Sequence, residues 1–429
     1  MPAAPAIAAL PAIPAPPAIP ATPTPLLDSL RSPDDLKALS LAHCDALAAE
    51  IRSFLVESVS RTGGHLGSNL GAVELTIALH RVFSSPVDKI VFDTGHQGYV
   101  HKLLTGRKDA FSSLRQQGGL SGYPNRSESP HDLVENSHAS TALSYAHGIA
   151  AAMELCSERD ETGSPYVVAV VGDGALTGGM AYEALNNLGH SGQRVLVVLN
   201  DNGRSYAPTI SKLSGSLTQL RLDPRYVRAR EVVRHRLRDL PGSVASVAYT
   251  SIHGLTSALR EVVEPHVFFE ALGIRYTGPI DGHDVSVLVQ ALERATRWPG
   301  PIVLHVLTTK GKGYPPAEAD EIACLHDLKV SPSPKAPAPS ALPRVGPGTG
   351  DLGALPGPSP QGESYTEAFS KALLKEAEKN EAVVAITAAM PGPTGLLSFE
   401  EHFPGRFFDV GIAEAHAMTT AAGMALCGL

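Results

Sequence analysis

An acid and an amide at the ends of two strand-like segments are the residues of this sequence best suited to chemistry. Asp173 lies in the Gly-Asp-Gly that ends "YVVAVVGDG", and Asn202 ends "RVLVVLNDN". The carboxyl ends of neighbouring parallel strands line the ligand crevice of an open sheet, so these two side chains should meet. Carboxylate and amide oxygens suit Mg²⁺, which retains bonds to phosphate oxygens. Gly-Asp-Gly alone would more often be a turn, but the pair predicts a magnesium-diphosphate site.

The segments around this pair predict an α/β fold. Between the two β-branched runs lies the helical "TGGMAYEALNNLGH", in which Met180, Ala184 and Leu188 recur every four residues, as an inward face requires. A strand–helix–strand unit implies a parallel, doubly wound sheet that is covered on both faces. "PIVLHVLTT" (301–309) predicts a further core strand, and the Ser-Pro-Asp-Asp that starts at Ser32 predicts a helix start.

Composition divides the chain into domains and connecting segments. The start is uncharged and rich in Ala, Pro and Ile, without the basic residues of a signal peptide or the Arg and Ser of a transit peptide. An arginine-rich stretch could be a nucleic-acid patch, but its interleaved acids favour a solvated insertion or lid. We therefore predict a disordered tail at 1–26, a first α/β domain at 27–330 with a mobile insertion at 203–262, a Pro/Gly-rich linker at 331–362, and a partial second α/β domain at 363–429.

The bulk composition excludes several classes of function. The net charge of −8 argues against a general role on nucleic acid or an anionic membrane, and the apolar runs are too short to span a bilayer. The four cysteines are scattered without a Cys-x-x-Cys pair, which argues against a disulfide framework or a zinc site. This pattern is typical of a protein in the reducing cytosol.

Several longer motifs extend the Asp173–Asn202 pattern, which resembles the thiamine-diphosphate fingerprint. They are "GGHLGSNLGAVELTIALHRVF", "VFDTGHQGYVHKLLTGR", "GGLSGYPNRSESPHDLVENSHAST", "YTGPIDGHD", "TTKGKGYPPAEAD" and "FFDVGIAEAHAMTTAAGMAL". In this order they are similar to the 1-deoxy-D-xylulose-5-phosphate synthase family, which has the transketolase-like thiamine-diphosphate fold. The resemblance implies condensation of pyruvate with D-glyceraldehyde 3-phosphate, with release of CO₂, by a cytoplasmic homodimer. It also implies that thiamine diphosphate and Mg²⁺ are the cofactors.

The resemblance also assigns roles to residues. It implies that Asp173, Asn202 and the backbone carbonyl of Arg204 bind Mg²⁺. It implies cofactor contacts from His96, Ser137, His138, Ala139, Gly174, Ala175, Asn202 and Tyr314, and from Glu414, the glutamate that faces the aminopyrimidine ring. Glu414, His65 and His326 are the implied catalytic residues. Any single histidine among the 17 is more often a core or surface residue, so these histidines depend on the motifs that contain them.

Two departures and two alternatives remain at this point. Gly203 stands where the family usually has an acid, Ala415 where it has Gln, and family members continue well beyond this length. We therefore expect a C-terminally truncated chain, from a gene fragment or an early stop, whose second domain has few strand partners and exposed apolar surface. The alternatives are a non-catalytic remnant that binds the cofactor or a partner chain, and a transketolase-like sugar transferase, against which "YTGPIDGHD" and "GGLSGYP" argue.

Overall fold

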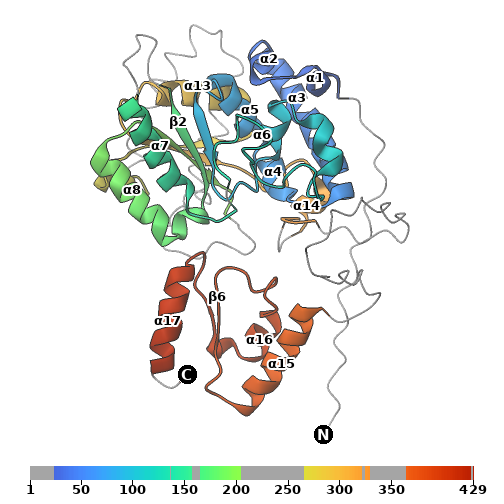
Figure 1. Ribbon diagram of the computed structural model, residues 1–429, viewed down its shortest axis with the longest axis vertical. Coiled ribbons are helices and arrows are strands. Elements are labelled where there is room, and N and C mark those ends of the chain that lie inside the picture. Colours follow the sequence, from blue (N-terminus) through green and yellow to red (C-terminus); the bar gives the residue numbers. More distant parts are fainter. Residues whose placement is uncertain are drawn as a thin grey trace, which may run out of the picture.

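The computed structural model (Figure 1) describes most of the chain in two units. The described residues are 24–135, 137–156, 165–203, 265–320, 324–328, 364–426 and 429. The predicted tail, insertion and linker lie almost entirely outside these residues, and so does the predicted ligand Arg204. The domain boundaries therefore stay predictions.

A five-stranded parallel sheet forms the centre of the first unit. Its strands are β1 (Lys89–Phe92), β2 (Val167–Gly172), β3 (Val195–Asp201), β4 (Arg275–Asp281) and β5 (Ile302–Leu307). They are arranged in the order β1-β2-β3-β5-β4, and every neighbouring pair is parallel. The predicted parallel α/β sheet and its further strand at 301–309 are confirmed. Because all strands are parallel, their carboxyl ends lie at one edge.

Helices cover both faces of this sheet because alternate strand residues point in opposite directions. Val167, Ala169 and Val171 pack with α7 (Ala142–Cys156), α8 (Gly179–Ser191) and α12 (Pro265–Ala271). Val168 and Val170 pack with α5 (Val73–Val82) and α13 (Val285–Ala295). Figure 1 shows α7 and α8, in green, on one side of β2. The sheet is therefore doubly wound, as predicted.

The remaining helices of the first unit build a third core cluster beside α5. They are α1 (Pro25–Ser29), α2 (Pro33–Lys37), α3 (Leu41–Thr62), α4 (Gly67–Gly71), α6 (Tyr99–Leu104) and η1 (Lys108–Ser113), while η2 (Ala175–Thr177) and α14 (Pro315–Glu318) follow β2 and β5. α2 begins as predicted, because Ser32 and Asp35 form a reciprocal capping box. Within the described residues, no helix combines the length and the apolar character needed to cross a membrane.

The predicted inward face of α8 is wrong at one position. Ala184 and Leu188 are buried, but 48% of Met180 is exposed. The buried residues of the helix are Ala181, Ala184, Leu185 and Leu188. A step of four residues overshoots a helical turn of about 3.6 residues, so a face followed in steps of four drifts round the helix. Spacings of three and four must alternate to stay on the core side.

The second unit is small and exposes several large apolar side chains. It contains α15 (Tyr365–Lys379), β6 (Ala385–Thr387), α16 (Leu397–His402), η3 (Pro404–Arg406), β7 (Phe407–Asp409) and α17 (Glu414–Leu426). β6 pairs in parallel with β7, its one partner strand in the described part of the chain. The large exposed apolar side chains of the second unit are Tyr365, Phe369, Met390, Leu397, Phe408, Met418 and Leu429. The expected shortage of strand partners and the exposed apolar surface are both found.

Candidate functional site

Asp173 and Asn202 meet at the carboxyl edge of the sheet. The register of β2 with β3 pairs Gly172 with Asn200, which brings the residues that follow each strand together. Asp173 is 3% exposed, and its Oδ1 accepts the backbone N–H of Asn202 at 3.4 Å. A buried carboxylate therefore lies beside the loop that carries the amide. Their role as metal ligands stays a prediction, as does that of Arg204.

The loop that carries Ser137, His138 and Ala139 is held against the Gly174–Ala175 turn by its neighbour Ser140. Ser140 has a positive φ of 71° and donates its hydroxyl to the carbonyl oxygen of Ala175 at 2.7 Å. The structure thus brings together two stretches that were predicted to contact the same cofactor.

Asp93, which follows β1, fixes the other side of this loop. Its Oδ1 accepts the N–H of Ser140 at 2.9 Å, and its Oδ2 accepts the N–H of Ala142 at 3.0 Å, at the first residue of α7. Burial raises the pKa of Asp93, and these N–H bonds oppose that rise. Asp93 was missed from the sequence, although an acid at the end of a buried strand is the signal that identified Asp173.

Three predicted histidines form one cluster. The ring centroids of His65 and His96 are 5.5 Å apart, those of His65 and His326 are 5.5 Å apart, and those of His96 and His326 are 5.2 Å apart. Tyr123 adds a fourth ring, 5.6 Å from that of His65. Residues far apart in the sequence therefore lie together in one cluster, and His326 belongs to it.

Asn69 links two of these histidines through their backbones. Its side-chain amide donates to the carbonyl oxygens of His65 at 2.7 Å and His96 at 2.9 Å. Its Oδ1 accepts the N–H of Tyr99 at 2.8 Å, at the start of α6. Asn69 is fully buried and was also missed, although it lies within the "GGHLGSNLG" motif.

His326 is carried into the cluster by the segment 324–328. Leu328 and Gly64 form an antiparallel bridge with N–H to O distances of 3.0 and 2.8 Å. The hydroxyl of Ser68 lies 3.3 Å from Nδ1 of His326. The segment is therefore anchored to the stretch that contains His65.

Burial keeps the clustered histidines neutral. Loss of solvation lowers the pKa of His65 to about 4 and that of His96 to about 3, and it also lowers the pKa of His326. Nδ1 of His65 and Nδ1 of His96 are buried with no hydrogen-bond partner among the described residues. Buried polar atoms are normally paired, so these two nitrogens fit a site that receives a polar ligand.

Asn200 connects the histidine cluster to the Asp173 corner. Its Nδ2 donates to the side-chain oxygen of Gln97 at 2.9 Å, next to His96, and its Oδ1 accepts the hydroxyl of Thr308 at 2.6 Å. The ends of β1, β3 and β5 are thereby cross-linked. Thr308 begins the turn that carries Tyr314, which directly precedes α14 and packs against the first-unit core.

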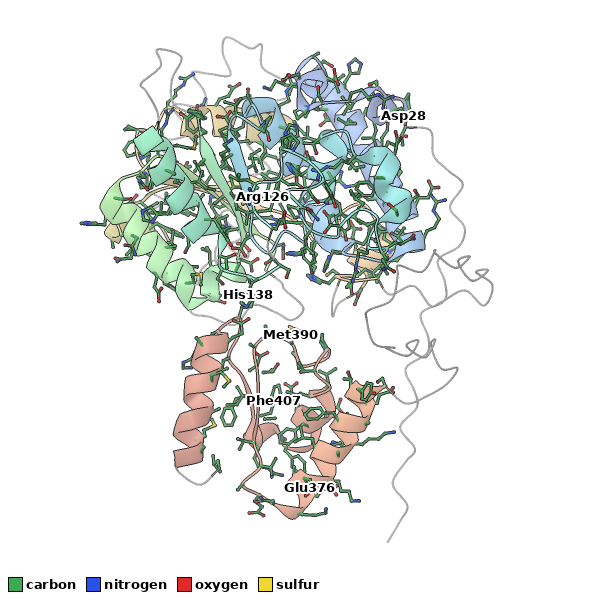
Figure 2. The ribbon with its side chains drawn as sticks, in the orientation of Figure 1. Asp28, Arg126, His138, Glu376, Met390 and Phe407 are labelled. Atoms are coloured by element: carbon green, nitrogen blue, oxygen red, sulfur yellow. The ribbon has the colours of Figure 1, made fainter. Side chains whose placement is uncertain are left out.

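Glu414 approaches the first unit at His138. Glu414 is the first residue of α17, and its Oε1 lies 3.9 Å from Nε2 of His138. Figure 2 shows His138 at the junction, with Met390 of the second unit nearby. A cavity of about 450 Å³ opens beside Glu414, lined by residues of α15 and β6 that include Phe369 and Leu373. The Glu414 side chain remains 54% exposed, unlike the buried histidines.

The described residues contain no metal site built only from His, Cys, Asp and Glu side chains. In the part of the chain that is described, no group of three or more His, Cys, Asp or Glu residues could hold a metal ion. The predicted ligand set is different, since it combines one carboxylate, one amide and one backbone carbonyl. It suits a hard cation that also binds ligand oxygens.

Two family models match this chain one after the other. A family model described as 1-deoxy-D-xylulose-5-phosphate synthase matches residues 27–308, and one described as the pyrimidine binding domain of transketolase matches residues 361–429. The chain is 52% identical over 404 residues to the 1-deoxy-D-xylulose-5-phosphate synthase of Mycobacterium tuberculosis H37Rv, covering 94% of this chain and 60% of that protein. The synthase of Mycobacterium avium strain 104 is also 52% identical, with 94% and 59% covered.

Solved transketolases are more distant. The enzyme from Leishmania mexicana matches with a TM-score of 0.46 and 19% identity, over 64% of this chain and 37% of that one. The enzyme from Campylobacter jejuni matches with a TM-score of 0.47 and 19% identity, over 67% and 40%. The present chain spans about 60% of the length of the curated relatives that it matches.

Proposed function

This chain belongs to the 1-deoxy-D-xylulose-5-phosphate synthase family, and on that premise we propose that it carries the thiamine-diphosphate site of that activity. The reaction condenses pyruvate with D-glyceraldehyde 3-phosphate to 1-deoxy-D-xylulose 5-phosphate and CO₂. Its product supplies the methylerythritol phosphate route to isoprenoids and the precursors of thiamine and pyridoxal. The observation that best supports the proposal is the buried Asp173 beside the Asn202 loop, cross-linked through Asn200 to the histidine cluster.

The cofactor would be held at the carboxyl edge of the sheet. Asp173, Asn202 and the carbonyl of Arg204 would bind Mg²⁺, and the N–H groups of Gly174 and Ala175 would face the diphosphate. The loop at 137–139, together with His96 and Tyr314, would complete the contacts. When bound, thiamine diphosphate supplies the electron sink that decarboxylation needs.

The chain's own side chains would manage the protons. Glu414 would hydrogen-bond the aminopyrimidine ring, for which a carboxylate at the start of a helix is suitably placed. His65 and His326 are neutral near pH 7 because burial lowers their pKa values. A neutral imidazole has one N–H donor and one acceptor nitrogen, so each could donate a hydrogen bond to a substrate oxygen or accept a proton from it.

We further propose that the protein works as a homodimer in the cytoplasm. The family resemblance supports the dimer, and the cysteines support a reducing compartment, because Cys44 and Cys324 are free and buried.

A second function, cofactor binding without turnover, is favoured by one observation. Glu414 is 54% exposed and lies against an open cavity, whereas a group that manages protons works best where water is excluded.

Calorimetry and a CO₂ assay separate these functions. Thiamine diphosphate should bind in the presence of Mg²⁺ and not in EDTA, Asp173→Ala should abolish that binding, and Asp109→Ala, at an exposed position, should not. Turnover of pyruvate with glyceraldehyde phosphate that Glu414→Gln abolishes would support the synthase, while binding without turnover would support the second function. Metal-dependent binding that survives Asp173→Ala would contradict the proposed site.

A further inference from the structure

The turn at 308–314, which follows β5, is held by contacts that no part of the proposed chemistry uses. It carries Tyr314, and its Lys310 is buried close enough to lower the pKa of all three clustered histidines. On one side the N–H of Gly311 donates to the carbonyl oxygen of Gly67 at 2.9 Å. On the other side the turn faces two charged residues and a histidine from three different elements.

His283, just before α13, contacts the turn directly. Its Nε2 accepts the backbone N–H of Thr309 at 2.9 Å, and its Nδ1 lies 3.1 Å from Oε2 of Glu74 on α5. The carboxylate can only accept, so Nδ1 must carry a proton, and the Thr309 N–H can only donate, so Nε2 must be unprotonated. Both partners therefore select the same neutral tautomer of His283.

Glu74 is held in its charged form by a second partner. Arg52 on α3 donates to the two carboxylate oxygens at 2.6 and 2.5 Å, and its Nε donates to the carbonyl oxygen of Lys312 at 3.1 Å. Burial alone would raise the pKa of Glu74, but the hydrogen bonds from His283 and Arg52, with the Arg52 charge, outweigh it and lower the pKa to about 2. One carboxylate thus organises contacts at both ends of the Thr309–Lys312 stretch.

Burial makes this arrangement more than a surface ion pair. The side chains of Arg52, Glu74 and His283 are 14%, 9% and 13% exposed. At that exposure, solvent does little to replace a lost hydrogen bond between these three side chains, so the His283 ring is held in place beside the Thr309 N–H, which belongs to an exposed residue. The backbone of the turn should therefore respond to any change in the His283 tautomer.

We propose that Glu74 and His283 are positioning residues for the cofactor site: the Glu74 carboxylate fixes the His283 tautomer, and Nε2 of that imidazole sets the 308–314 turn through the Thr309 N–H. This inference rests on the proposed function in one respect, the contact of Tyr314 with thiamine diphosphate. Neither residue touches the reacting atoms.

Two substitutions of His283 separate its two hydrogen bonds. The side-chain amide of His283→Gln reaches the place of Nε2 and can accept the Thr309 N–H. That of His283→Asn reaches only the place of Nδ1 and can donate to Glu74. Glu74→Gln removes the charge that selects the tautomer, and Glu293→Gln, at an exposed position of α13, is the control.

The full chain is measured in three ways: histidine ¹⁵N shifts, hydrogen exchange of the Thr309 amide, and the Kd of thiamine diphosphate with Mg²⁺. We expect an unprotonated Nε2 for His283, and a mixture of tautomers in Glu74→Gln. His283→Asn should exchange Thr309 faster and raise Kd about fivefold to tenfold, the loss of about one hydrogen bond. His283→Gln should restore both to near the values of the wild type and of Glu293→Gln.

A proton on Nε2 of His283 in the wild type would overturn the inference, as would equal Thr309 exchange in the Gln and Asn variants. If the wild-type chain binds no thiamine diphosphate, the proposed function fails. The nitrogen shifts and the Thr309 exchange still decide the positioning role in that case, because neither requires the cofactor.

Discussion

A methyl group at Gly67 should dislodge His326 from the histidine cluster. Gly67 begins α4, and a Cβ built on it would overlap the carbonyl oxygen of Cys324, a backbone atom that cannot swing away as a side chain can. The segment 324–328 would have to move outward in Gly67→Ala, taking His326 with it. The variant therefore tests whether the packing of segment 324–328 against Gly67 keeps His326 in the cluster, without replacing any histidine.

The expected loss of stability follows from the contacts of this segment. Outward movement breaks the Gly67 N–H bond to the carbonyl oxygen of Leu325 (3.0 Å) and the contact of the Ser68 hydroxyl with His326 (3.3 Å). Each of these two hydrogen bonds contributes about 1 kcal/mol, and overpacking costs about 1–3 kcal/mol, so Gly67→Ala should lower the free energy of unfolding by about 3–5 kcal/mol. Once exposed, His326 should also regain a pKa near its usual value of about 6.5.

Urea unfolding and a histidine NMR titration measure the two effects. Gly148→Ala is the matched control, because it adds the same methyl to α7 at a position with nothing nearby. It should raise stability by up to about 1 kcal/mol through helix propensity. If Gly67→Ala unfolds at the same urea concentration as the wild type, or if His326 still resists protonation, the segment is not held by the Gly67 contact and the reasoning is refuted.

Two further predictions concern the buried histidines and α8. The pKa values of His65, His96 and His326 are lowered in the folded protein. Their contribution to stability is therefore complete above the unfolded pKa near 6.5 and is lost as pH falls, down to about 4 for His65 and about 3 for His96. The free energy of unfolding should fall by about 1 kcal/mol per pH unit per histidine between pH 7 and 5. In His65→Gln the slope should be smaller by about 1 kcal/mol per pH unit, the contribution of one histidine. On α8, Leu188→Ala should lower the free energy of unfolding in urea by about 2–5 kcal/mol. Met180→Ala, at a 48% exposed position, should lower it by less than about 0.5 kcal/mol. An equal loss for both variants would mean that Met180 lies on the buried face of α8 after all.

The parallel sheet was predictable from sequence because its signals are local. β2, α8 and β3 each show their own period over a few residues, and a parallel sheet follows from their order. The same reasoning placed Asp173 beside Asn202, since both are defined by strand ends. It failed for Met180 because a face read in steps of four ignores the pitch of the helix.

The supports of the site were not predictable, because each depends on residues far apart in the chain. Glu74 and His283 are separated by 209 positions, and Ser68 and His326 by 258. No local period marks such pairs, and each residue alone has an ordinary explanation on a helix face or in a turn. Asp93 is the exception, because an acid at the end of a buried strand was already a known signal.

The two halves of the candidate site differ in how firmly they are built, and this difference separates binding from turnover. Asp173, the Asn202 loop and the clustered histidines belong to elements cross-linked by Asn200, Asn69 and Asp93. Glu414 depends on a small core of four buried side chains, Ala377, Ala385, Leu396 and Phe399, and is itself mostly exposed. A site of this kind should bind a diphosphate well, because the proposed anchors are preorganised. It should position the aminopyrimidine poorly, because Glu414, the residue proposed to face the ring, is not preorganised. Cofactor affinity should therefore depend strongly on Asp173 and weakly on Glu414, and turnover should depend on what is packed against the second unit.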